Sequence, residues 1–295
     1  MCHQITCGNN DLIDKKYSDA FTWYMTPEDY FLPDQIDSGS GVMVNNPNKC
    51  TFNSCHSFDL GYIHFVCLNS NKDYSMFDEN NGEKIDDWIQ RECAWLDADL
   101  TRDESNDKTR WVICYMHYAP FTVSRPDWIQ RFVPVFEKHR VHLVLCGHNH
   151  TNSRSIVIRS GYDGDPKKTS YDPKGQKTAE EETALGHGTI NHNEDLKNGT
   201  LYLMINATGF KNTGKESIQN PYPWWYGLRT SHPTQPTYAT LTIGWDKIEY
   251  KCYKIMNTLS KDRNGNTIVV PYGSQTKELY DSCTLNWRAK GQTII

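Results

Sequence analysis

The sequence lacks the features of several large protein classes. No segment approaches eighteen uninterrupted apolar residues, so hydropathy predicts no membrane-spanning helix. It has no long basic run, and the formal net charge of -5 makes nucleic acid a poor candidate partner. Residues 1–30 lack a basic start followed by an apolar stretch, so no signal peptide is predicted in this chain. These absences leave a globular enzyme or binding protein of unknown oligomeric state.

Cysteine is plentiful, and the ten residues are predicted to include both free thiols and disulfide-bonded pairs. Three lie inside apolar runs and are predicted to be buried free thiols: Cys67, Cys114 and Cys146. Two pairs are candidate surface disulfides, namely Cys50 with Cys55 and Cys252 with Cys283. Asn198 and Asn206 begin triplets that fit the glycosylation pattern. Disulfides and glycosylation would fit a secretory or extracellular protein, but the compartment stays unknown.

The chain alternates predicted strands and helices. Its 37% apolar residues can form a substantial core. Four short apolar runs predict buried strands: Gly61–Leu68, Trp111–Met116, Val141–Cys146 and Leu201–Ile205. Helical spacing of apolar residues predicts helices over Lys84–Leu100 and Pro126–His139, the second kinked at Pro134. This alternation predicts an α/β fold in which helices cover a sheet.

The second half of the chain has a different composition. Residues 155–199 are polar and are predicted to form a surface insertion. Strands are predicted again from Thr237, and Asn264 with Gly265 fits a hairpin turn. We therefore expect one domain over residues 1–258. Residues 259–295 would be a C-terminal extension, a hairpin packed on that domain.

The strongest local signal is the segment LVLCGHNHTNSR, residues 143–154. An apolar strand leads into Gly147, which would let the backbone approach closely, and His148 and His150 follow. Two imidazoles at this spacing can reach one small volume and suit Zn, Fe or Mn. The alternative is a polar loop whose histidines bond to neighbours. Arg154 is a candidate phosphate contact, with a surface salt bridge as the alternative.

Two further segments end in candidate ligands. The strand in WVICYMHYAPF ends at His117, and QITC, a candidate strand, ends before Asn9 in the Gly-Asn-Asn-Asp turn. Open α/β sheets bind ligands at the carboxyl ends of their strands. An amide oxygen can complete the coordination of a hard or borderline cation. Asn9, His117, His148 and His150 are therefore the predicted metal ligands.

Together these motifs resemble the calcineurin-like metallophosphoesterases, in particular the purple acid phosphatase branch. The resemblance rests on the GN loop at Gly8, the strand-ending His117 and the GHNH segment, and it covers residues 5–154. It implies an αββα sandwich of two packed mixed β-sheets flanked by helices. It also implies hydrolysis of phosphate monoesters or diesters by two metal ions, which polarise the ester and activate water for in-line attack. The implied partner is a phosphate-ester substrate.

The same resemblance implies a role for each matching position. Asn9, His117 and His148 would bind one metal ion, and His150 would bind the other. Asn10 stands where the family has a histidine that stabilises charge or protonates the leaving group. An amide donates a hydrogen bond but delivers no proton at neutral pH.

The family's aspartate motifs should precede the GN loop by tens of residues, whereas seven residues precede Gly8 here. We therefore expect an N-terminally incomplete domain. Its four neutral ligands would hold one ion, because two cations close together need a bridging carboxylate. Whether this chain is an enzyme stays uncertain at this stage. The alternative is a catalytically inactive or truncated metal-binding relative.

Overall fold

The structure, a computed structural model, describes about half of the chain. The described residues are 55–70, 85–120, 127–148, 150, 152–155, 157, 192–195, 199–205, 226–229, 236–256, 259–269 and 275–287. The chain divides into two compact units, the first made of residues 1–148 and 159–174 and the second of residues 149–158 and 175–295. Asn9, Asn10, Cys50, Asn206 and most of the polar segment 155–199 lie outside the described residues.

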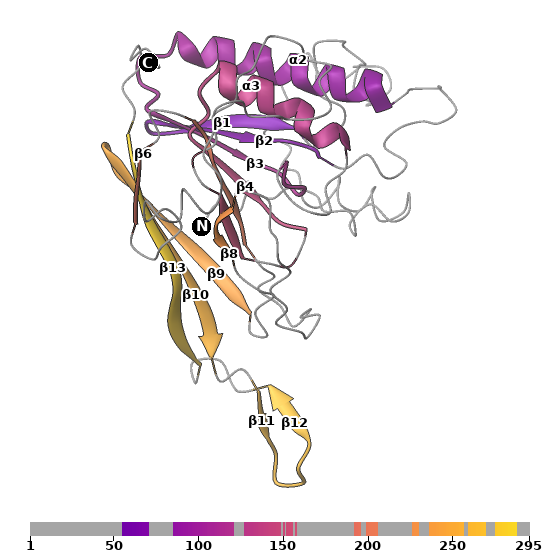
Figure 1. The fold of residues 1–295 in the computed structure, drawn as a ribbon, viewed down its shortest axis with the longest axis vertical. Helices are drawn as coiled ribbons and strands as arrows, with labels where there is room; N and C mark the ends of the chain where they lie inside the picture. The colour runs from indigo at the N-terminus through magenta and orange to yellow at the C-terminus, as the bar shows by residue number, and fades with distance from the viewer. Residues whose placement is uncertain are drawn as a thin grey trace, which may run out of the picture. The chain divides into compact units, whose positions relative to one another are not determined.

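The first unit contains a four-stranded run of sheet (Figure 1). Its strands, in spatial order, are β1 (His56–Leu60), β2 (Ile63–Cys67), β3 (Trp111–Tyr115) and β4 (Leu143–Cys146). β1 is antiparallel to β2, and β2, β3 and β4 run parallel. The turn from β1 to β2 is tight and uses Gly61 at a φ of 64°, a conformation that glycine adopts without strain. The buried strands predicted from apolar runs are confirmed, because a parallel sheet buries both faces.

Two helical segments belong to this unit and lie over one face of its sheet (Figure 1). The helix α2 (Ile85–Glu104) confirms the predicted amphipathic helix and buries Ile89, Leu96 and Leu100. The second predicted helix differs from expectation. It begins as the 3₁₀ helix η4 (Asp127–Phe132) and continues as α3 (Val133–Lys138), with Pro134 in the first turn of α3. Proline starts the α-helix here instead of kinking it, because the first turn needs no N–H from that position.

No helix among the described residues is long and apolar enough to span a membrane.

The second unit contains two further groups of strands. In one group β5 (Ser153–Ser155) lies between β7 (Leu201–Met204) and β8 (Tyr226–Arg229), antiparallel to both. In the other the order is β6 (His192–Asp195), β13 (Thr276–Asn286), β10 (Lys247–Met256) and β9 (Thr237–Ile243). The strands predicted near Leu201 and from Thr237 are thereby confirmed. Buried and more exposed residues alternate in the first part of β10, which is typical of a sheet with one covered face.

The two groups pack on each other through buried polar contacts. Arg154 on β5 donates from Nε and Nη2 to the carboxylate of Asp281 on β13, at 3.0 and 3.1 Å. Thr237 on β9 donates to Asn152 Oδ1 at 3.2 Å. Arg154 is fully buried, so the surface salt bridge considered from the sequence is wrong. The pair joins two sheets, and the predicted α/β fold with two packed sheets is confirmed.

The disulfide between Cys252 and Cys283 is not formed. Both cysteines are buried and outside any disulfide, as are Cys67, Cys114 and Cys146, for which the sequence predicted this state. In the β10–β13 register Cys252 faces Asp281 and Cys283 faces Tyr250, so the two thiols are diagonal neighbours. Diagonal pairs lie about 7–8 Å apart, too far for a disulfide without movement of the backbone. Cys55 is disulfide-bonded, but its predicted partner Cys50 lies outside the described residues.

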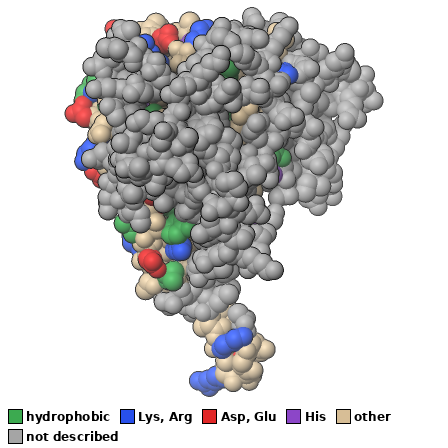
Figure 2. All heavy atoms as spheres, in the orientation of Figure 1, with side chains coloured by type: hydrophobic (Ala, Val, Ile, Leu, Met, Phe, Trp, Pro, Cys, Tyr) green, Lys and Arg blue, Asp and Glu red, His purple; other side chains and the backbone are tan. Residues whose placement is uncertain are grey.

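A separate hairpin follows β10. Its strands are β11 (Leu259–Lys261) and β12 (Thr267–Val269), and Gly265 has a φ of 82°, which confirms the predicted turn. Exposed Lys and Arg side chains lie on this hairpin, at the bottom of Figure 2. The domain boundary at residue 258 stays a prediction. β13, from the segment beyond that boundary, lies within the four-stranded sheet between β6 and β10.

Candidate metal centre

His117 and His148 lie at the carboxyl ends of two neighbouring parallel strands. His117 comes two residues after β3, and His148 two residues after β4. The hydrogen-bond ladder continues beyond both strands, because Met116 N donates to Leu145 O at 3.0 Å and Gly147 N donates to His117 O at 2.9 Å. This ladder places the two imidazoles beside each other at one edge of the sheet, where open α/β sheets bind ligands.

The two rings are arranged as a pair of metal ligands would be. His117 Nε2 lies 3.2 Å from His148 Nδ1, with ring centroids 5.1 Å apart and ring planes at 76°. Two nitrogens that each lie 2.0–2.1 Å from one tetrahedral ion are about 3.3 Å apart. At this separation one ring can donate a proton to the other, or both can direct lone pairs at one cation. The separation of His117 and His148 is therefore compatible with the metal that the sequence implies.

The backbone of this segment is strained. His148 has a φ of 74° and His150 a φ of 51°, both in the left-handed region that residues with a Cβ rarely adopt. Such conformations persist where the surrounding structure holds them, and they cluster at functional sites. Gly147 differs from expectation. A Cβ there would meet His117 atoms at 3.8 Å, an ordinary contact, so close approach does not require glycine.

The other predicted site residues are not tested by this geometry. His150 is described and half-buried, but it belongs to the second unit. Asn9 and Asn10 lie outside the described residues. The structure thus brings together His117 and His148, and the assignments of Asn9, Asn10 and His150 stay predictions. Arg154, the candidate phosphate contact, directs its guanidinium at Asp281 instead.

Comparison with known families adds the deciding observation. The model of one family, described as calcineurin-like phosphoesterase, matches residues 4–152, which span both histidine motifs. The chain belongs to the calcineurin-like phosphoesterase family. This agrees with the resemblance seen over residues 5–154, and metal-dependent cleavage of phosphate esters is the activity of the family.

Curated relatives of this chain are distant. Two uncharacterized proteins from two strains of Mycobacterium tuberculosis are each 25% identical to it over 164 residues. The alignment covers 52% of this chain and 27% of each relative, so the chain spans about a quarter of the length of the curated relatives it matches. The activity of the whole protein therefore does not follow from them.

Two solved structures are similar to the chain. One is a purple acid phosphatase from yellow lupin (Lupinus luteus) seeds, with a TM-score of 0.42 and 15% sequence identity. The match covers 83% of this chain and 34% of the phosphatase chain. The other is a structure of PhoD, with a TM-score of 0.44 and 13% sequence identity. The match covers 95% of this chain and 49% of the PhoD chain.

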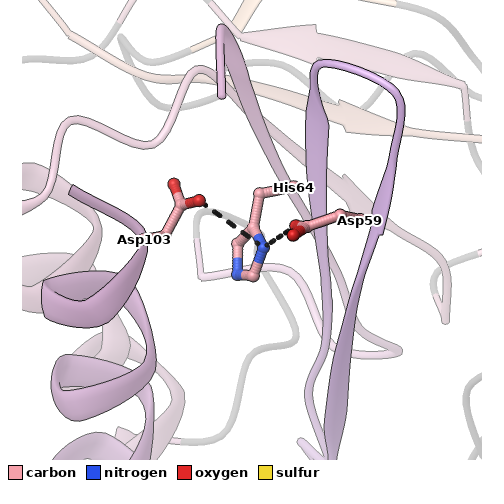
Figure 3. A group of neighbouring side chains, drawn as sticks. All are labelled: Asp59, His64 and Asp103. Atoms are coloured by element: carbon pink, nitrogen blue, oxygen red, sulfur yellow. Dashed lines mark hydrogen bonds and ion pairs between the residues drawn. The ribbon is translucent and has the colours of Figure 1, made fainter. Parts of the chain in front are cut away.

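A second group of side chains in the chain has the composition of a metal site. Asp59 on β1, His64 on β2 and Asp103 on α2 each offer an atom, and these atoms lie within 4.8 Å of one another. Figure 3 shows Asp103 extending from the helix and Asp59 from the neighbouring strand toward the imidazole of His64. This group lies at the amino end of β2, opposite the edge that carries His117 and His148.

Hydrogen bonds and ion pairs among these side chains explain why they lie close together, and no metal ion is needed to hold them. His64 Nδ1 lies 2.7 Å from Asp59 Oδ1, and Nε2 lies 2.9 Å from Asp99 Oδ2, so both ring nitrogens bond to carboxylates. Asp103 accepts from Thr109 Oγ1 at 2.5 Å. Burial by itself lowers the pKa of His64, but the hydrogen bonds to Asp99 and Asp59 outweigh it and raise the pKa to about 9. His64 is an imidazolium at neutral pH, held in a structural ion network.

Sequence reasoning missed the surroundings of both histidine sites. His64 was read as part of the apolar run GYIHFVCL, and its carboxylates come from α2, 35 and 39 residues away along the chain. A signal was present, because Asp99 and Asp103 are spaced four apart and interrupt the apolar side of that helix. At the other edge, Tyr118 packs against both predicted ligands and Ser70 bonds to its backbone. Tyr118 is adjacent to His117 in the sequence.

Proposed function

We propose that this chain binds a transition metal at the carboxyl edge of β3 and β4 and hydrolyses phosphate monoesters or diesters there. The observation that carries the proposal is the 3.2 Å separation of His117 Nε2 and His148 Nδ1. Membership of the calcineurin-like phosphoesterase family supports the reaction class. The class of substrate is likewise proposed and does not follow from the curated relatives, because the chain covers only 27% of their length.

In this proposal His117 and His148 hold the ion through imidazole nitrogens, and Asn9 and His150 complete its ligands. Imidazole and amide ligands suit Zn, Fe or Mn. The bound ion would supply Lewis acidity toward the phosphoryl oxygen and an activated water for in-line attack. Both histidines follow ends of neighbouring parallel strands, so their backbone positions would be set before an ion binds. The proposed ligands are neutral, and we therefore expect one ion per chain where the family has two.

Because Asn10 stands where the family has a histidine, we expect the proposed enzyme to lack a general acid for the leaving group. Its amide can donate a hydrogen bond to the phosphate but cannot protonate a leaving group. General acid catalysis contributes about 10²–10⁴-fold in enzymes that use it. Aryl esters leave as phenolates without that proton, whereas alkyl esters need it. We expect slow hydrolysis of aryl phosphates and almost none of alkyl phosphates.

The test uses the purified chain loaded with Zn²⁺ or Mn²⁺. Metal content is measured by elemental analysis, and turnover is measured with an aryl phosphate and an alkyl phosphate. The Asn10→His variant should raise alkyl ester hydrolysis by at least about tenfold, and more than it raises aryl hydrolysis. Asn106→His, on a residue near the end of α2, is the matched control. Two equivalents of metal, or robust wild-type turnover of alkyl esters, would contradict the proposal.

Asn10 also favours a second candidate, a metal-binding protein without turnover. In that case the chain binds one ion through His117 and His148 and hydrolyses neither aryl nor alkyl esters. The assay above separates the candidates, because metal binding is common to both and hydrolysis to only one. Failure of Asn10→His to produce any activity would favour the non-catalytic role.

A further inference from the structure

Tyr118 is the aromatic residue that contacts both histidines of the candidate metal centre. Its ring centroid lies 4.2 Å from that of His148 and 5.2 Å from that of His117, with the second pair edge to face. Only 6% of Tyr118 is exposed. Aromatic pairs at these distances have preferred relative orientations, so the tyrosine ring restricts how each imidazole can turn.

Tyr118 is itself fixed by a third strand end. Its backbone N–H donates to Ser70 Oγ at 2.9 Å, and Ser70 is a fully buried residue that follows β2. Two residues on, Pro120 O accepts from the side chain of Gln130 on η4 at 3.3 Å. The segment after His117 is therefore anchored at both ends, to the strand on one side and to the 3₁₀ helix on the other.

The contact with the Tyr118 ring bears on how the two imidazoles are rotated. The torsion about the bond from Cβ to an imidazole ring is broad, so a histidine at a strand end samples many ring orientations. His148 also has a strained backbone that the surrounding structure must hold. If either ring turned, His117 Nε2 and His148 Nδ1 would no longer converge. Residues that orient metal ligands in this way typically change metal affinity by about 10–100-fold.

We propose that Tyr118 is a positioning residue for the metal centre, whose ring, anchored through Ser70, orients His117 and His148 toward one ion. The inference rests on the proposed function in that an ion binds between these two histidines. It adds that the aromatic ring of Tyr118, not its hydroxyl, is required. It further places part of the control of ligand geometry at Ser70, in the segment that follows β2.

The experiment measures Co²⁺ binding by the full chain, since the visible spectrum of Co²⁺ reports coordination geometry. Tyr118→Leu should weaken binding by about 10–100-fold and shift the visible bands. Tyr118→Phe keeps the ring and should bind within about twofold of wild type, with an unchanged spectrum. Ser70→Ala leaves the ring but removes its anchor, and should shift the bands with a smaller loss of affinity.

Phe136→Leu is the control for general destabilisation. Phe136 is a fully buried aromatic on α3 that stacks on Phe132, so its loss should lower stability, and we expect the Co²⁺ spectrum to stay unchanged. All spectra are recorded below the unfolding temperature of each variant. If Tyr118→Leu does not fold, Ser70→Ala decides. An unchanged spectrum in whichever variant is used overturns the inference.

The outcome stays separable from that of the proposed function. A chain that binds Co²⁺, shows the Tyr118 and Ser70 effects and hydrolyses no phosphate ester supports the positioning role and overturns the hydrolase proposal. A chain that hydrolyses esters with the same Co²⁺ spectrum in wild type and Tyr118→Leu does the reverse. A wild-type chain that binds no Co²⁺ overturns both.

Discussion

The two edges of the β1–β4 sheet both carry buried or half-buried histidine, in opposite chemical settings. At the carboxyl edge, His117 and His148 face each other across 3.2 Å and pack on Tyr118. At the amino edge, His64 bonds to Asp59 and Asp99, with Asp103 at 3.8 Å. One edge joins two imidazoles that can share a cation, and the other supplies carboxylates that hold a protonated imidazole.

The difference shows that a group of potential ligands is not by itself a metal site. The amino-edge group has the more typical mixture of carboxylate and imidazole, yet both ring nitrogens of His64 already bond to carboxylates and Asp103 Oδ1 accepts from Thr109. Asp99 adds Ser57 and Arg102 to its partners. The carboxyl-edge pair has fewer ligands but a backbone under strain and an aromatic neighbour. The first arrangement contributes stability, and the second is proposed to contribute chemistry.

The largest expected effect tests the carboxyl edge. His117→Gln should lower the affinity for Zn²⁺ by more than about 100-fold, since residues that only orient a ligand account for about 10–100-fold and this change removes a direct ligand of the proposed site. The free energy of unfolding without added metal should change little, because His117 is only half-buried. Competition with a chelator measures the affinity. His64→Gln is the contrasting variant and should keep wild-type affinity; equal losses in the two variants would mean that the edges are not functionally distinct.

The next effect tests the amino edge. His64→Gln should lower the free energy of unfolding by about 3 kcal/mol, because it removes the buried cation that Asp103 faces and leaves Asp99 with Arg102 alone as its cation. His139→Gln is the matched control. His139 is also buried and bonds to Asp97 and Glu104, but these carboxylates are 38% and 56% exposed. Water can replace their partner, so we expect a loss of about 1 kcal/mol or less. Denaturant unfolding measures both, and a larger loss for His139→Gln would contradict the ion-network interpretation.

The sequence predicted the carboxyl edge better than the amino edge, and the reason is physical. The segments WVICYMH and LVLCGHNH each show a strand that ends in histidine. Parallel strands bring their carboxyl ends to one edge of the sheet, so the sequence alone predicts that these histidines lie close together. The partners of His64 depend on how α2 is rotated over the sheet, and apolar periodicity places that helix without saying which acidic residues it buries. Likewise the diagonal register that keeps Cys252 and Cys283 apart is set by strand pairing over long sequence separations. The arginine beside GHNH is buried because β13, far along the chain, supplies its aspartate.

A smaller effect concerns pH. The pKa of His64 is raised from its ordinary value of 6.5 to about 9, so its contribution to stability is fully present below pH 6.5 and is lost as pH rises through 9. Between pH 7 and pH 9 the wild type should lose about 2 kcal/mol of unfolding free energy relative to His64→Gln. The groups facing the imidazole are Asp59 from β1 and Asp99 and Asp103 from α2. Parallel pH profiles for the two proteins would show that His64 is neutral in the folded state.

The smallest expected effect returns to the carboxyl edge. A glycine before a histidine pair suggests that the backbone needs the space, but a Cβ at Gly147 would only touch His117 at 3.8 Å. Gly147→Ala should therefore keep Zn²⁺ affinity within about twofold and raise the free energy of unfolding by about 0.5 kcal/mol, through the lower entropy of the unfolded chain. Gly61→Ala, where φ is 64°, is the contrasting variant and should be destabilised by about 1 kcal/mol. If Gly147→Ala instead loses its metal, the strained turn around His148 depends on glycine, and the histidine pair is held by its backbone more than by Tyr118.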